Sequence, residues 1–219
     1  MSALKLHQKL ENHVGLLIFG ILFVSAVGGL VQILPSLAEE SLKTPLPHVR
    51  DYTAVELVGR DIYVRENCSV CHSQQIRPLL AEIKRYGPYS RAGEFVYDRP
   101  FLWGSKRTGP DLHRIGGKYS DDWHRLHLID PRAVVPNSIM PSYPWLAKRP
   151  ASAAGDVQAN MRALRRLGHA YTDEDIDSAP AQLEGLMEVD AVIAYLQMLG
   201  TGFDENTDGS ADDSHGAAH

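Results

Sequence analysis

The chain has 219 residues, of which 44% are hydrophobic and 22% are charged, and this ordinary globular composition excludes a disordered or low-complexity protein. A formal net charge of −5 excludes a globally basic nucleic-acid-binding protein. Two cysteines exclude a disulfide-dense scaffold and a four-cysteine zinc site, and a mean hydropathy of −0.22 excludes many membrane spans while permitting one.

The first predicted element is a membrane-spanning helix over residues 14–34, a stretch without any charged side chain. At 1.5 Å per residue it is about 31 Å long, which matches the roughly 30 Å hydrocarbon core of a bilayer. The alternative is a cleaved signal peptide, but the apolar run is longer than the usual ~7–15 residues of such a segment. We therefore expect a retained single-pass anchor in the lipid bilayer, preceded by residues 1–13 in the cytoplasm, which Lys5 and Lys9 weakly favour.

The remainder is predicted to be a mainly helical domain between two non-globular segments. Residues 35–52 lack strong periodicity and are predicted to be a linker, and residues 53–200 form the domain. Residues 201–219 contain five acids and no Lys or Arg, so we expect an acidic disordered tail in which His215 and His219 are solvated. Within the domain, apolar periodicity and capping residues predict helices over 53–67, 120–129, 152–167 and 183–199, with a short helical turn from Thr172.

Both cysteines lie in the single motif Cys68-Ser69-Val70-Cys71-His72. On one helical turn the two thiols face the same way and can add to the two vinyl groups of haem, while the adjacent imidazole points at the iron. A thioredoxin-like dithiol would open a helix after a strand, whereas here a predicted helix precedes the cysteines. Half of a zinc site would need further ligands, and the only candidate pair, His124 and His127, suits a surface or interface role better. The motif therefore predicts one covalent haem c, with its histidine as an axial ligand to the iron.

A second axial ligand is predicted at Met140, in the loop Pro136-Asn137-Ser138-Ile139-Met140-Pro141. A thioether favours reduced iron and raises the potential, and the flanking prolines stiffen the loop that holds this weak ligand. Met161 lies among arginines in a charged helix, and Met187 and Met198 lie on the terminal helix as core or surface side chains, so all three are weaker candidates. A histidine ligand in place of Met140 is the remaining alternative.

Several residues around the motif resemble those of class I cytochromes c. Gly59 and Tyr63 resemble the glycine and aromatic residue of the N-terminal helix of that fold, and Tyr195 resembles the aromatic partner in the last helix that crosses it. The sequence Gly109-Pro110-Asp111-Leu112 resembles the loop whose proline carbonyl accepts a hydrogen bond from the haem histidine. The resemblance implies that Pro110 accepts this bond from His72, which would fix the imidazole tautomer.

Residues 59–146 resemble one family in particular, the membrane-anchored mono-haem subunit (subunit II) of cbb3-type cytochrome c oxidases. The shared motifs are Gly59-Arg60-Asp61-Ile62-Tyr63, Cys71-His72-Ser73-Gln74, Ile76-Arg77-Pro78, Arg85-Tyr86-Gly87, Ala92-Gly93-Glu94-Phe95-Val96-Tyr97-Asp98, the stretch from Trp103 to Leu112, Tyr119-Ser120-Asp121, the stretch from Trp123 to Leu128, and the stretch from Met140 to Leu146. The resemblance implies one N-terminal transmembrane helix followed by a class I cytochrome c-like haem domain with a long insertion.

The resemblance also implies the partners and the location of the chain. Such a complex reduces O₂ to water and translocates protons. Its catalytic subunit holds a low-spin haem b and a haem b₃ with copper, and a di-haem cytochrome c subunit commonly completes it. The chain would accept electrons from the di-haem subunit or a periplasmic cytochrome c donor and pass them to haem b, without a substrate-reducing centre of its own. Because c-type haem is attached outside the bacterial cytoplasmic (inner) membrane, the N-terminus is expected in the cytoplasm and the haem domain in the periplasm.

Residues 73–107 lie between the haem motif and the Pro110 loop and are rich in basic and aromatic side chains. Arginine and aromatic residues are enriched at interface cores, and basic side chains suit charge-assisted hydrogen bonds to haem propionates. We therefore expect a docking surface for the catalytic subunit in this segment, with a solvated loop as the alternative. The residues expected to dock are Trp103, Ser105, Lys106 and Arg107. The expected compartment argues against single-stranded nucleic acid as the partner.

The sequence leaves three other functions open. The cytochrome c subunit of a nitric oxide reductase also has one anchor and one c-type haem, but lacks the motifs of residues 103–112 and 123–128. A free-standing anchored cytochrome c would shuttle electrons outside any enzyme complex. A non-redox interaction protein would carry the haem motif by accident and bind no haem. The role of residues 147–182 is also open, and an insertion resting on the haem domain is the interpretation.

Overall fold

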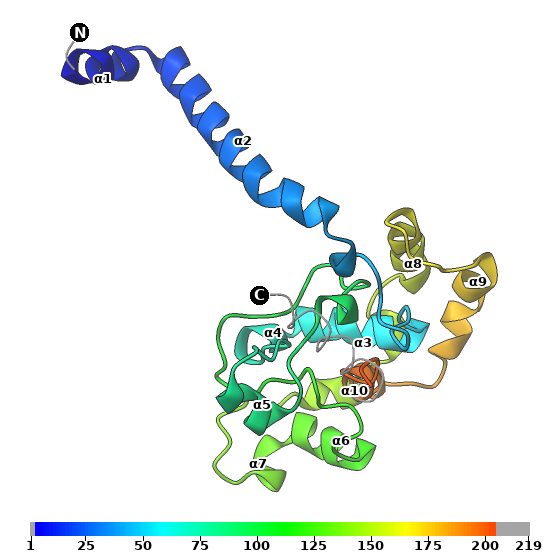
Figure 1. The fold of residues 1–219 in the computed structure, drawn as a ribbon. Coiled ribbons are helices and arrows are strands. Elements are labelled where there is room, and N and C mark those ends of the chain that lie inside the picture. Colours follow the sequence, from blue (N-terminus) through cyan, green and yellow to red (C-terminus); the bar gives the residue numbers. More distant parts are fainter. Residues whose placement is uncertain (1–2, 205–219) are drawn as a thin grey trace. The chain divides into compact units, whose positions relative to one another are not determined.

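The computed structural model of the protein describes residues 3–204. The chain divides into two units, residues 1–44 and residues 45–219. Figure 1 shows helices in both, and the described part contains no β-strand, only an isolated bridge between Pro150 and Met187. The predicted mainly α fold class is confirmed. The predicted tail lies almost entirely outside the described residues, as do His215 and His219.

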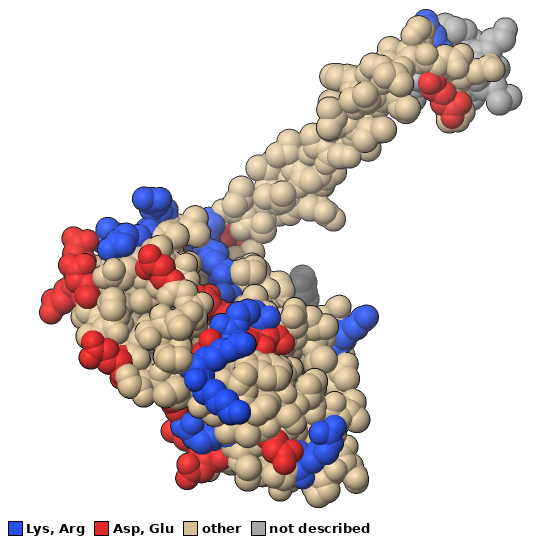
Figure 2. Space-filling view, turned by 180° about the vertical axis from the view of Figure 1, so that it is seen from behind, with Lys and Arg blue, Asp and Glu red and all other residues tan. Residues whose placement is uncertain are grey.

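The first unit consists of α1 (Ala3–Asn12), α2 (Val14–Ala38) and the 3-10 turn η1 (Glu40–Leu42). α2 is long and apolar enough to cross a membrane, with a mean hydropathy of 2.6 over its most apolar window. Figure 2 shows it as a surface without charged side chains. The helix continues past its predicted end at residue 34. Pro35 has no N–H group to donate, but the Pro35 carbonyl oxygen still accepts a hydrogen bond from Glu39 N–H at 3.1 Å, so the helix does not end there.

The second unit begins earlier than the predicted domain start at residue 53. Arg50 forms an ion pair with Glu56 at 2.7 Å, and the Tyr52 side chain is buried. The end of the predicted linker over residues 35–52 is therefore part of the folded unit, because these side chains have partners within it. Figure 2 shows acidic and basic side chains on the surface of this unit, as expected for a domain that faces water.

Two helices form the centre of the second unit, α3 (Ala54–Arg65) and α10 (Glu188–Met198). α3 starts where it is predicted, since the Thr53 hydroxyl and the Glu56 carboxylate form a capping box around its first turn. α10 starts later than the predicted helix over 183–199, because the backbone of Gly185 has a φ of 76° and interrupts the helical conformation.

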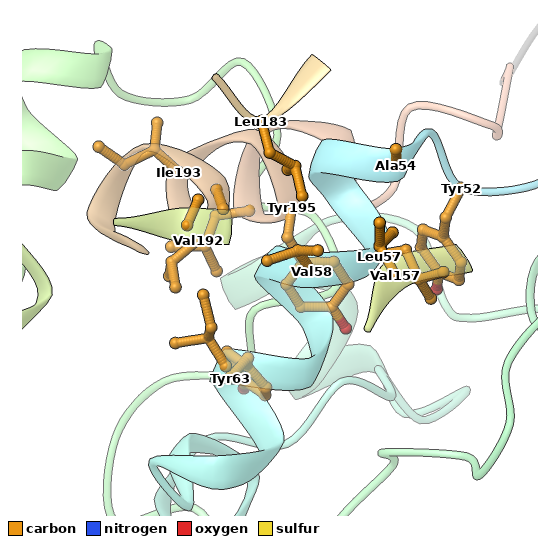
Figure 3. Close-up of a cluster of buried hydrophobic side chains, with 14 of the residues drawn as sticks. Tyr52, Ala54, Leu57, Val58, Tyr63, Val157, Leu183, Val192, Ile193 and Tyr195 are labelled. Carbon is orange, nitrogen blue, oxygen red and sulfur yellow. The ribbon is translucent and has the colours of Figure 1, made fainter. Parts of the chain in front are cut away.

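The two central helices cross in close contact. A Cβ atom on Gly59 would lie 1.9 Å from the Ala191 carbonyl oxygen, so only glycine permits this approach of the two backbones. Beside the crossing, the rings of Tyr63 and Tyr195 pack with their centroids 5.4 Å apart. Figure 3 shows these rings among the buried apolar side chains of both helices. Aromatic packing at a glycine contact thus fixes where α10 meets the helix that leads to the haem motif.

The segment between the haem motif and the Pro110 loop contains α5 (Leu80–Tyr86) and the 3-10 turn η2 (Ala92–Glu94) and is otherwise irregular. A buried cation ties it to α3. The Arg60 guanidinium donates to the Arg99 carbonyl at 2.9 Å and lies 3.5 Å from the Asp98 carboxylate. A buried charge is tolerated when it is paired and hydrogen-bonded in this way. The segment is therefore an insertion fixed to the core.

The elements between the insertion and α10 follow in chain order. They are α6 (Asp121–Ile129), α7 (Pro131–Val134), η3 (Pro144–Ala147), η4 (Ala151–Ala153), α8 (Val157–Arg166) and α9 (Asp173–Gln182). α6 and α9 begin at the predicted caps, Ser120 and Thr172. α8 begins later than the predicted helix over 152–167, because the Asp156 carboxylate accepts from Ala159 N–H at 3.0 Å and caps a later first turn.

Residues 147–182 pack into the core of the second unit. α8 and α9 contact α3, and Val157, Met161, Ile176 and Ala179 are buried in the same cluster as the helix crossing. Figure 1 shows α8 and α9 along one side of the unit, with α5, α6 and α7 toward the other end. The structure therefore gives this segment a packing role in the domain.

Candidate haem site

A cavity of about 590 Å³ opens beside α4 (Cys68–Cys71), the single helical turn that carries the haem motif. Its walls include both cysteines, His72 and Met140, and an apolar side formed by Leu128, Val192 and Leu196. Cofactor pockets have volumes of about 300–1,000 Å³ and are mainly apolar with a few polar groups. A chamber of this size with two thiols, an imidazole and a thioether fits a haem group.

The two cysteines sit where the chain leaves α3. Asn67 has a φ of 60°, and this left-handed residue turns the chain into α4. Both thiols are free and partly buried. Burial raises the pKa of the Cys68 thiol to about 12, so this thiol is neutral at physiological pH. Both cysteines lie on one helical turn at the wall of this mainly apolar cavity, an arrangement that suits covalent attachment of a haem.

The imidazole of His72 is oriented by the loop that follows the insertion. Its Nδ1–H donates to the Pro110 carbonyl at 2.9 Å, which leaves Nε2 as the atom for binding a metal. A Cβ atom on Gly109 would lie 2.3 Å from Cε1 of the ring, so a glycine is required where the loop crosses it. Burial lowers the pKa of His72 and favours the neutral form that a metal ligand needs.

Met140 reaches the same cavity from the loop between α7 and η3. Its backbone N–H donates to the Ser138 hydroxyl at 3.2 Å, and its side chain is partly buried against the core. Met161 belongs to α8, is 2% exposed and has its side chain in the core. Of the methionines that the structure describes, only Met140 lines the cavity. The structure thus brings Met140 and His72 into one chamber.

His124 and His127 of α6 also line the cavity, a position that the sequence did not indicate. His124 Nε2 and His127 Nδ1 are buried without a hydrogen-bond partner among the described residues, and burial lowers the pKa of both imidazoles. The Trp123 indole stacks on the His127 ring at 4.6 Å. Within residues 3–204, no group of three or more His, Cys, Asp or Glu side chains could hold a metal ion.

The four residues expected to dock against the catalytic subunit differ in their surroundings. Ser105 and Lys106 are exposed, and Trp103 is half-buried. The Arg107 side chain is only 16% exposed and pairs with the Glu82 carboxylate at 2.8 Å. This guanidinium lowers the pKa of Glu82 to about 2. Arg107 is therefore engaged within the chain, and Lys106 is its exposed neighbour.

The crossed helices and the one-turn motif in its cavity together define a mono-haem cytochrome of the class I cytochrome c fold. A comparison with known protein families matches residues 7–187 to the family described as cytochrome c oxidase, mono-haem subunit/FixO. The match covers most of the chain, which therefore belongs to this family of mono-haem subunits of cbb3-type cytochrome c oxidase. A comparison with individually curated proteins gives no match.

The family assignment confirms the resemblance inferred from the motifs. It identifies an oxidase subunit rather than a nitric oxide reductase subunit or a free-standing carrier. The matched residues include α2, so the candidate membrane helix is part of the family's sequence. Membership implies one haem and partner subunits of the oxidase.

Proposed function

We propose that the chain binds one haem c through thioether bonds to Cys68 and Cys71, with His72 and Met140 as axial ligands, and serves as the electron-transfer subunit of the oxidase. The observation that carries this proposal is that all four side chains line one cavity, although they come from two distant segments. When bound, the haem supplies a one-electron redox centre whose potential depends on its axial ligands and on burial.

The surrounding residues hold this arrangement in place. Gly59 lets α3 approach α10, so that Tyr63 and Tyr195 pack beside the cavity. The Tyr195 hydroxyl is linked to the Gln74 side chain at 3.0 Å, which ties α10 to the chain just after His72. A fixed ligand position reduces the rearrangement that accompanies a change in charge, which is what an electron carrier requires.

Covalent haem attachment is tested on the full chain expressed with c-type maturation machinery. Intact mass spectrometry under denaturing conditions should show one haem on the wild-type protein. The double variant Cys68→Ala, Cys71→Ala should lose this mass, because no thiol remains for a thioether bond. A wild-type chain without covalent haem would reject the proposal and favour a non-redox interaction protein.

In the complex, the chain receives electrons from a di-haem cytochrome c subunit or a periplasmic cytochrome c and passes them to the low-spin haem b of the catalytic subunit. It has no substrate-reducing role of its own, and O₂ reduction with proton translocation takes place in the catalytic subunit. Support comes from membership of a mono-haem oxidase-subunit family and from a site made of attachment and ligand residues.

The orientation in the membrane follows from where c-type haem is attached. We place residues 1–13 in the cytoplasm, α2 in the bacterial inner membrane as a retained anchor, and the second unit in the periplasm. Protease added to intact spheroplasts should digest the haem-bearing unit. Protection until the membrane is opened would contradict this orientation.

We assign docking to the catalytic subunit to the exposed Ser105 and Lys106 and the half-buried Trp103 of the predicted segment, whereas Arg107 pairs with Glu82 within the chain. Lys106→Ala should lower the yield of assembled oxidase and its O₂ turnover, because it removes an exposed cation suited to haem propionates. Lys148→Ala, an exposed lysine on another segment, is the matched control and should have no effect. Equal assembly and turnover in both variants would reject this docking surface.

A further inference from the structure

Buried polar side chains form a network directly behind the haem motif. The Asp111 carboxylate is completely buried and accepts from the Ser73 hydroxyl at 2.6 Å and from Gln75 N–H at 2.9 Å. Ser73 follows His72 in the sequence, and Asp111 follows Pro110. One carboxylate thus joins the two segments that provide the donor and the acceptor of the histidine hydrogen bond.

Arg107 closes this network. Its Nε–H donates to the Ser73 hydroxyl at 2.6 Å, its terminal N–H group donates to the Gln75 carbonyl at 2.7 Å, and the guanidinium lies 3.5 Å from the Asp111 carboxylate. Glu82 of α5 holds the guanidinium from its other edge, at 2.8 Å. The contacts use several donors of a planar fork, and a lysine ammonium cannot reproduce that geometry.

Backbone hydrogen bonds connect the same two segments. Gly109 N–H donates to the Cys71 carbonyl and Leu112 N–H donates to the Ser73 carbonyl, both at 2.9 Å. The Pro110 carbonyl lies between these two contacts in the sequence and accepts from His72. Its position therefore depends on how firmly residues 107–112 are held against residues 71–75.

We propose that Arg107, Ser73 and Asp111 form a clamp that positions the Pro110 carbonyl against His72 and so sets the potential of the haem. The three are positioning residues, because they act through the Pro110 carbonyl. A carbonyl that accepts from Nδ1–H makes the imidazole a stronger ligand, and a stronger ligand favours the oxidised iron. Loosening the clamp should therefore raise the potential. This inference rests on the proposed role of His72 as an axial ligand.

Direct electrostatics would give Arg107 the opposite effect. A positive charge near the iron disfavours the oxidised form, so removing the charge alone would lower the potential. If Arg107 acts by positioning the Pro110 carbonyl, removing the charge of Arg107 raises the potential. Replacing Arg107 by a residue that keeps the charge but lacks the planar guanidinium raises the potential as well. The sign of the shift therefore distinguishes the two explanations.

The experiment uses the full-length holoprotein in detergent. Ser73→Ala and Arg107→Lys keep the net charge, Arg107→Gln removes one charge, and Lys106→Gln removes the exposed neighbouring charge as a control. The midpoint potential is measured by optical redox titration, and the orientation of the His72 ring is followed by proton NMR of the oxidised protein. Weakening the hydrogen bond from His72 to the Pro110 carbonyl should raise the equilibrium constant for reduction about fivefold in the first two variants.

Arg107→Gln should shift the potential in the same direction, with altered His72 NMR signals in all three clamp variants, whereas Lys106→Gln should change neither readout. An unchanged potential and unchanged His72 signals in both charge-preserving variants would overturn the clamp. A fall in potential confined to Arg107→Gln would overturn it as well.

If Arg107→Lys fails to incorporate haem, Ser73→Ala decides, because it removes a single hydroxyl group. Absence of covalent haem from the wild-type protein would instead reject the proposed function, and intact mass detects that outcome separately.

Discussion

At Gly109 the chain passes so close to the His72 ring that a methyl group would lie 2.3 Å from Cε1. The next residue supplies the carbonyl that accepts from Nδ1–H. Two consecutive residues thus fix the position and the tautomer of the imidazole from within the chain. A ligand held in this way needs little reorganisation when the charge on a bound metal changes, which suits electron transfer.

The identity of the second ligand can be tested by exchanging it. Met140→His should keep a six-coordinate haem and lower its midpoint potential, because an imidazole favours oxidised iron more than a thioether does. Met161→Leu is the control, since this buried methionine lies outside the cavity and the substitution conserves volume. Redox titration of both holoproteins checks the prediction, and an unchanged potential in Met140→His would show that another residue is the ligand.

The ion pair of Glu82 makes a pH-dependent contribution to folding. Arg107 lowers the Glu82 pKa to about 2 from an ordinary value of about 4.3. Below 4.3 the unfolded chain binds more protons at this group than the folded chain, so the stabilisation is complete above pH ~4.3 and disappears as the pH falls toward ~2. Glu82→Gln should therefore destabilise the protein at neutral pH, and this destabilisation should shrink across that window.

Denaturant unfolding followed by tryptophan fluorescence can measure this, because Trp103, Trp123 and Trp145 all lie in the second unit. The control is Glu184→Gln, which alters an exposed glutamate. A difference in unfolding free energy between Glu82→Gln and wild type that stays constant from pH 7 to pH 2 would contradict the prediction.

The haem motif was predictable because its chemistry is local. The spacing of Cys68, Cys71 and His72 lies within five consecutive residues, so no tertiary information is needed to interpret it. The partners of Arg107 could not be predicted in this way. In the sequence, Arg107 follows Lys106 in a basic and aromatic segment, which is typical of a docking residue. Only the fold shows that Arg107 pairs with Glu82 and lies beside Asp111.

At the scale of elements, helix starts were predicted correctly where a Ser or Thr side chain caps the helix. Thr53, Ser120 and Thr172 begin α3, α6 and α9 because a capping side chain acts on the backbone a few residues ahead. α8 and α10 begin later than predicted. The apolar periodicity of the sequence continues through Asp156 and Gly185, whereas the helical backbone conformation begins only after these residues. The role of the α8 and α9 segment depends on long-range packing, which local periodicity does not specify.

The crossing of α3 and α10 gives the sharpest prediction about packing. Gly59→Ala would place a methyl group 1.9 Å from the Ala191 carbonyl, so the two helices must separate. We expect a loss of about 3 kcal/mol in unfolding free energy, measured by denaturant titration. Gly155→Ala is the matched control, because a Cβ there meets no atom within 4 Å. Similar stabilities of the two variants would show that the crossing is less tight than described.

At the scale of the whole molecule, the chain joins a charge-free helix to a water-facing unit that holds the candidate haem cavity. Residues 201–219 carry five acids, so residues 1–200 have no net charge. The helix α2 is a candidate single membrane span, and membership of the family implies partner subunits of the oxidase.

The central claim is that the chain carries haem c and works inside an oxidase complex. It is tested most directly by a reduced pyridine-haemochrome spectrum of the chain, affinity-purified from mildly solubilised native membranes. We predict haem c together with haem b in the same preparation, and O₂ consumption by it. Haem c alone in a monodisperse preparation would contradict the account and indicate an anchored cytochrome that carries electrons outside any complex.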